Sequence, residues 1–129
     1  MELGEEYAIE TFPTTGTGIV EQRLNETSHY MMNYMDEDYI KKGSKYPFFN
    51  TALNYFNTLA FCKRWIIDKE HINKDFNNIT YKNLNNKLKK LGKCGAISAY
   101  SALYDSKGSY VSQTEKSIFI TDKGCDVLN

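Results

Sequence analysis

The chain has 129 residues, of which 41% are hydrophobic and 25% are charged, a length and composition typical of one folded domain with its own core. Sixteen basic and sixteen acidic residues give a formal net charge of zero at pH 7. No apolar run approaches the roughly 20 residues of a membrane span, and acidic residues stand where a secretory signal would have basic ones. These features argue against a membrane protein and against export.

The three cysteines, Cys62, Cys94 and Cys125, form no CxxC pair. An odd number of cysteines favours reduced thiols in a cytoplasmic protein, and ordinary thiols are favoured over redox sensors. The thiols could instead bind metal together with His29 or His71, but the spacing matches no established zinc pattern. We therefore expect a cytoplasmic protein with no cofactor and no metal site.

The zero net charge hides an uneven distribution along the sequence. Residues 1–42 carry nine acidic and three basic residues, a net charge of −6, whereas residues 69–93 carry seven lysines and two acidic residues, a net charge of +5. A partner responds to the local field within a Debye length of about 8–10 Å, so the basic segment favours an anionic partner.

The first 46 residues are predicted to form an arm and a helix. Residues 1–22 have no helical period and are rich in Thr and Gly, which indicates a flexible or extended N-terminal arm. A helix is predicted from Asn25, as N-cap, to Lys42. Its Tyr and Met residues form an apolar face, so residues 23–46 are a possible dimerisation element, although packing within the same domain is an equal alternative.

Residues 47–129 are predicted to form the main domain. A central core helix is expected from Phe48 to Ile67, because its apolar residues fall on one broad face, and a short helix or turn is expected at 68–78. A second amphipathic pattern follows at 80–92, where Leu84, Leu88 and Leu91 recur at i, i+4 and i+7.

Two strands complete the predicted domain. The runs 96–103 and 117–120 are strand-like and are separated by turn residues at 105–108, so they are expected to pair as a β-hairpin. Thr121 is expected to cap a short closing helix. The resulting fold class is mainly α with a small β-hairpin (α+β), a winged helix-turn-helix.

The sequence from Leu88 through Gly95 to Ile97, and then Ile120-Thr-Asp-Lys-Gly124 followed by Leu128, resembles the winged-helix repressors of the multiple-antibiotic-resistance (MarR) and phenolic-acid-decarboxylase (PadR) regulator types. The resemblance covers about residues 48–129. It departs from those families in a long wing rich in Ser and Tyr, and in lacking the long C-terminal dimerisation helix. The resemblance implies a homodimeric transcriptional regulator that binds double-stranded DNA.

In this interpretation helix 80–92 enters the major groove and the wing, 96–120, contacts the backbone. Asparagine can pair with adenine edges and lysine neutralises phosphates, so both kinds of residue on this helix are candidates. The predicted DNA-binding residues are Lys82, Asn83, Asn86, Lys87, Lys89, Lys90, Lys93, Lys107 and Tyr110. The same polar face could simply be solvated, and a winged-helix protein–protein interaction module without DNA binding is the alternative.

An enzyme is not expected from the sequence. The chain has two histidines, and neither lies in a cysteine or carboxylate pattern that indicates a reaction. No phosphate-binding glycine motif follows a predicted strand.

Overall fold

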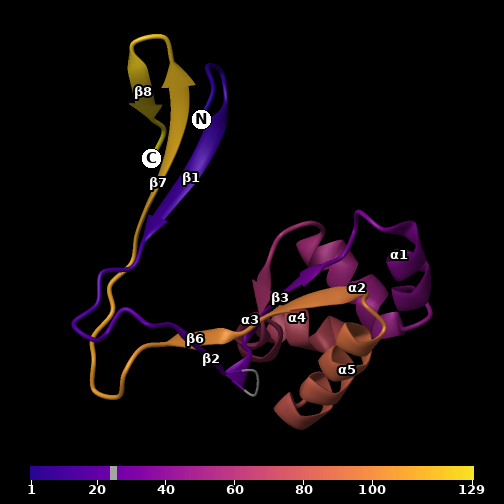
Figure 1. Ribbon diagram of the computed structural model, residues 1–129. Helices are drawn as coiled ribbons and strands as arrows, with labels where there is room; N and C mark the ends of the chain where they lie inside the picture. Colours follow the sequence, from indigo (N-terminus) through magenta and orange to yellow (C-terminus); the bar gives the residue numbers. More distant parts are fainter. Residues whose placement is uncertain (24–25) are drawn as a thin grey trace. The chain divides into compact units, whose positions relative to one another are not determined.

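A computed structural model describes residues 1–23 and 26–129 and divides the chain into two compact units (Figure 1). Met1–Glu21 and Leu103–Asn129 form the first, which we call the sheet unit. Gln22–Ala102 forms the second, which we call the core unit. The two ends of the sequence therefore belong to the same unit.

The core unit combines helices with a small antiparallel sheet. The sheet has the strand order β4-β3-β5, with His29 opposite both Cys62 and Tyr100. Its strands are β3 (His29–Met32), β4 (Phe61–Cys62) and β5 (Ile97–Tyr100). Its helices are α1 (Glu37–Gly43), α2 (Pro47–Phe56), α3 (Lys63–Asp68), α4 (Glu70–Asp75) and α5 (Tyr81–Lys93).

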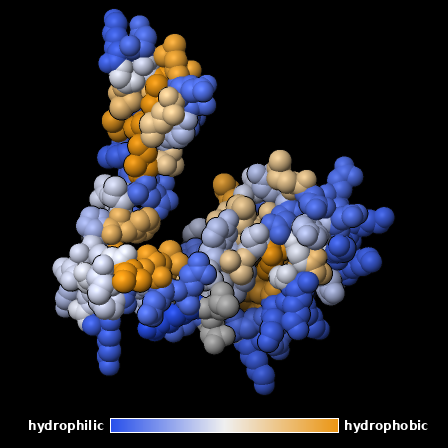
Figure 2. All heavy atoms as spheres, viewed as in Figure 1, coloured by the Kyte–Doolittle hydropathy of each residue, from blue (hydrophilic) through white to orange (hydrophobic). Residues whose placement is uncertain are grey.

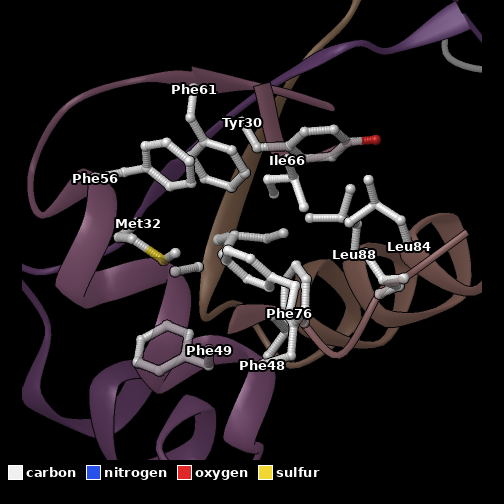
Figure 3. Packing of buried hydrophobic residues seen from close by; sticks show 14 of the residues in the cluster. Tyr30, Met32, Phe48, Phe49, Phe56, Phe61, Ile66, Phe76, Leu84 and Leu88 are labelled. Carbon is white, nitrogen blue, oxygen red and sulfur yellow. The ribbon is translucent and has the colours of Figure 1, made fainter. Parts of the chain in front are cut away.

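A continuous hydrophobic core fills the core unit (Figure 3). Met32 from β3, Phe61 from β4 and Leu84 from α5 are almost completely buried in it. The rings of Phe56 and Phe61 stack at 4.5 Å between centroids. Burial of side chains of this size contributes about 1.5–3 kcal/mol each, so this core accounts for the stability of the unit.

Helix α5 agrees with its predicted position. Leu84, Leu88 and Leu91 are buried on its inner face. The Thr80 side chain accepts a hydrogen bond from the Asn83 backbone N–H, which caps the N-terminus of the helix.

The sheet unit is built on three antiparallel strands in the order β1-β7-β8. These are β1 (Glu6–Thr11), β7 (Thr114–Thr121) and β8 (Gly124–Val127). Because opposed residues share a face, Tyr7, Ile118 and Val127 lie on an apolar face, while Glu6 lies on the other face. Two further strands, β2 (Glu21–Arg23) and β6 (Ala102–Tyr104), form a two-stranded sheet where the chain passes between the units.

The predicted winged helix is wrong. Strand β7 pairs with β1 and β8, whereas β5 pairs with β3, so residues 96–103 and 117–120 form no hairpin. The expected cap, Thr121, is instead the last residue of β7, opposite Gly124 in a β-hairpin. The expected closing helix is strand β8. The fold is α+β with three antiparallel sheets among the described residues, not a mainly helical winged helix-turn-helix.

Two of the predicted helices are also wrong in extent. The run Phe48–Ile67 is interrupted after α2, because Asn57 adopts a left-handed backbone (φ 47°) and Phe61–Cys62 pairs with β3. In the segment 25–42, His29–Met32 is strand β3, and a helix begins only after Asp36, whose carboxylate caps α1. The expected N-cap Asn25 lies outside the described residues.

The predicted domain division into 1–22, 23–46 and 47–129 stays a prediction. Residues 6–11 of the predicted arm form β1 of the sheet unit. Among the helices of residues 1–23 and 26–129, none is both long and apolar enough to cross a membrane.

Candidate functional site

Two carboxylates face each other across the sheet unit. Glu10 on β1 is directly opposite Glu115 on β7, and both side chains are exposed. Directly opposed residues on antiparallel strands have Cβ atoms about 4.5–5.5 Å apart, and like charges there destabilise the pair. Strand stability therefore does not explain this pair, whereas a cation between the two carboxylates would offset the repulsion.

A glutamine amide fixes one side of the pair. Gln113 Nε2 donates a hydrogen bond to Glu10 Oε2 at 3.0 Å. This bond occupies one oxygen of Glu10. Among the described residues, the other oxygen of Glu10 and both oxygens of Glu115 accept no hydrogen bond from a protein group. Carboxylate oxygens of this kind suit hard divalent cations such as Mg²⁺ and Mn²⁺.

The loop that follows β1 is held by Asp105. Its carboxylate accepts hydrogen bonds from the Thr14 hydroxyl (2.8 Å), the Thr17 hydroxyl (2.8 Å) and backbone N–H (3.0 Å), and the Gly18 N–H (3.0 Å). The Ser106 N–H also donates to it. The Ser106 bond, then those of Thr14 and Gly18, hold the pKa of Asp105 well below its ordinary value. Asp105 is therefore ionised and anchors the loop.

Gly16 is required by the same arrangement. A Cβ atom at this position would lie 2.5–2.6 Å from the Asp105 carboxylate group, closer than real Cβ contacts allow. The loop can approach Asp105 this closely because residue 16 has no side chain.

A largely apolar pocket lies beside this loop in the sheet unit. It has a volume of about 390 Å³, and Phe12, Leu103 and Val111 are exposed apolar residues in its wall. Gln113, which donates to Glu10, also lines it. Figure 2 shows apolar side chains at the visible surface of the sheet unit. The pocket and the carboxylate pair are therefore linked through Gln113.

The structure separates the residues predicted to bind DNA into two groups. Seven lie on the exposed face of α5: Lys82, Asn83, Asn86, Lys87, Lys89, Lys90 and Lys93. Lys107 and Tyr110 are exposed in the sheet unit instead, on the segment between β6 and β7.

No pattern in the sequence singles out Glu10 and Glu115. They are 105 positions apart, and no local motif surrounds either one. Only the pairing of β1 with β7 brings them together. The two acidic residues Glu6 and Glu10, which fall on one face of a strand opposite to Tyr7 and Ile9, were the one signal that could have indicated a two-faced strand there.

Three curated relatives of the chain are methionine aminopeptidases by name. No protein-family model matches the chain. It is 35% identical to methionine aminopeptidase 2-2 of Pyrenophora tritici-repentis over 130 residues, covering all of this chain and 26% of the relative. It is 36% identical to methionine aminopeptidase 2 of Dictyostelium discoideum (all of this chain, 27% of the relative) and 38% identical to methionine aminopeptidase 2A of Arabidopsis thaliana (93% and 25%). The chain thus spans about a quarter of these relatives.

A solved structure shares the fold. The structure of a thermophilic Arx1 matches 98% of this chain and 30% of its own with a TM-score of 0.68 and 15% sequence identity. At this identity the match shows the fold alone.

These findings overturn the predicted identity and function. The relatives are aminopeptidases by name, and no comparison points to a MarR/PadR-type regulator, to DNA binding, to transcription regulation or to the alternative interaction module. Double-stranded DNA and a homodimer are likewise unsupported as partners. The physical reason is that a lysine-rich face on an amphipathic helix is compatible with simple solvation, so it did not identify a partner. Because relatives named as peptidases are spanned only in part, the prediction that the chain is not an enzyme is unsupported and its enzymatic status stays open.

Proposed function

We propose that the sheet unit contributes two metal-binding carboxylates to a methionine aminopeptidase, which removes amino-terminal methionine from a polypeptide. The observation that carries this proposal is the position of Glu10 directly opposite Glu115 on β1 and β7. The names of the relatives support the activity, and two of them align over all of this chain, which includes both strands.

The residues present fit part of a metal centre. Two opposed carboxylates can bridge or chelate divalent ions, and two-metal sites occur in aminopeptidases. Within residues 1–23 and 26–129, no group of three or more His, Cys, Asp or Glu side chains is placed to hold a metal ion. In this proposal the remaining ligands therefore come from polypeptide that the relatives have and this chain does not span.

The chain's own residues have distinct roles in this proposal. A bound metal pair would polarise the scissile carbonyl and lower the pKa of its bound water. Glu10 and Glu115 present their oxygens on one face of the sheet, and the Gln113 amide orients Glu10. The pocket beside Gln113 accepts an apolar side chain, and methionine is apolar and flexible enough to fill an irregular cavity.

Metal binding by the chain tests the first part of the proposal. Titration with Mn²⁺, followed by electron paramagnetic resonance, is expected to show a site that Glu10→Gln and Glu115→Gln each weaken by at least about tenfold, since each removes an ionised ligand. Glu6→Gln is the matched control, because Glu6 lies on the same strand and face but opposite Phe119. Equal Mn²⁺ binding in all four proteins would exclude the carboxylate pair as a metal site.

Activity requires the remaining ligands, so a chimaera tests the second part. Residues 1–129 replace the aligned part of the Dictyostelium discoideum relative, and release of methionine from a methionyl peptide is measured. Glu10→Gln and Glu115→Gln are expected to lower kcat by on the order of 100-fold or more, while Glu6→Gln leaves kcat unchanged. Full activity of the Glu115→Gln chimaera would contradict the proposed catalytic role.

The cytoplasm remains the proposed compartment. The proposal is supported by the number of cysteines, because an odd count without a CxxC pair favours reduced thiols.

A further inference from the structure

Two hollows in the core unit share Lys63 in their walls. The first hollow, of about 400 Å³, lies between α3 and α5, and its wall includes Lys63, Asn85 and Lys89. The second, of about 410 Å³, includes Lys63, Arg64 and His29. Neither hollow is lined by a carboxylate.

The charge around these hollows is not neutralised locally. The core unit has thirteen Lys and Arg residues against seven Asp and Glu, a net charge of +6, and α5 contains no acidic residue. In the part of the chain that the structure describes, the ion pairs are Arg23–Glu26 and Lys74–Glu70, so Lys63, Arg64 and Lys89 take part in none. The hollows therefore present uncompensated positive charge.

The hydrogen bonding of Lys63 positions this charge. Lys63 Nζ donates to Asn85 Oδ1 at 3.2 Å, which ties the ammonium group to α5, and both residues line the first hollow. A lysine ammonium has three donors, so two remain for a ligand. The bond also uses the acceptor of the Asn85 amide and leaves its NH₂ group as a donor. Lys63, Asn85 and Lys89 thus present donors to one hollow.

We propose that these hollows form a binding site for a small phosphate-bearing ligand, held by Lys63 together with Lys89 and Arg64. Phosphate oxygens are strong acceptors, and charge-assisted hydrogen bonds from lysine and arginine are the strongest that a site of this composition can make. Leu88 and Ala99, which also line the first hollow, are suited to contact the uncharged part of such a ligand. This site does not depend on the proposed peptidase function, because it uses no residue of the sheet unit.

Titration of the 129-residue chain with inorganic pyrophosphate, followed by isothermal calorimetry, tests the site. Lys63→Met is expected to weaken binding about tenfold or more, and Lys89→Met and Arg64→Met by smaller factors, because Lys63 faces both hollows. Lys82→Met is the matched control, since Lys82 is an exposed lysine of α5 that lines neither hollow. The melting temperature of each variant establishes that it is folded.

The controls distinguish binding at specific residues from general attraction of an anion to the basic surface. Inorganic phosphate is expected to bind more weakly than pyrophosphate at the same site and to show the same dependence on Lys63. Absence of pyrophosphate binding at about 50 mM salt, where screening is weaker than at physiological ionic strength, would overturn the proposal. Equal weakening by Lys82→Met and Lys63→Met would also overturn it, because the affinity would then come from the basic face as a whole.

Discussion

The core unit and the sheet unit are stabilised in different ways. In the core unit, buried side chains from helices and strands form one continuous cluster. In the described residues of the sheet unit, Ile118 is the one buried hydrophobic residue, and Ile9 and Val127 on the same sheet are 38% and 60% exposed. The sheet unit therefore relies on strand pairing and on the hydrogen bonds of Asp105. Its carboxylates are placed where they do not contribute to stability, which is typical of residues used for chemistry.

The largest predicted effect lies in the core unit. Leu84→Ala removes a completely buried side chain of α5 and is expected to lower the free energy of unfolding by about 2–5 kcal/mol. Leu103→Ala is the control, because Leu103 is 62% exposed in the sheet unit, and its effect should stay within about 0.5 kcal/mol. Chemical denaturation measures both. Similar losses of stability in the two variants would contradict the conclusion that only the core unit depends on a large buried core.

Ile118→Ala addresses the small core of the sheet unit. Ile118 packs beside Tyr7 and Val127 on the apolar face, so its truncation is expected to cost about 2 kcal/mol, the low end for such changes. The loss should be local: amide exchange should accelerate in β7 and β1 and stay unchanged in α5. Faster exchange in α5 as well would mean that the two units unfold together.

The same contrast between the units explains which helices and strands could be predicted from the sequence. Helix α5 was predicted because its apolar period is contained within thirteen residues. The run Phe48–Ile67 has a similar period, yet its helix ends at Phe56, since pairing of Phe61–Cys62 with β3 outweighs helix propensity.

The sheet unit was not predictable from local patterns. Strands β1 and β7 are more than 100 residues apart in sequence, and each one alone is compatible with other pairings. Predicting β7 as a wing strand was the natural consequence of pairing it with its nearest strand-like neighbour. The Glu10–Glu115 pair depends wholly on this long-range register, so the candidate site was missed together with the sheet.

Asp105 gives the sheet unit a predicted pH dependence. Because hydrogen bonds hold its pKa below the ordinary value of 3.8, the stabilisation is complete at higher pH and is lost as the pH falls below that value. Amide exchange at Thr17 and Gly18 should therefore accelerate relative to the core unit in acid. Asp105→Asn should show fast exchange at every pH, because an amide cannot accept the same bonds with both atoms. Equal protection in wild type and variant at pH 7 would exclude Asp105 as the anchor of this loop.

The smallest predicted effect separates stability from function at the carboxylate pair. Without divalent metal, Glu115→Gln removes the repulsion with Glu10 and is expected to raise the free energy of unfolding by a few tenths of a kcal/mol. With Mn²⁺ in excess of its dissociation constant the order should reverse, because the metal binds and stabilises the wild type more strongly than the variant. Melting temperatures measured with and without Mn²⁺ reveal the reversal, with Glu6→Gln as the control. If Glu115→Gln were destabilising without metal, repulsion between the two carboxylates would not weaken the folded sheet, and the argument for a cation between them would fail.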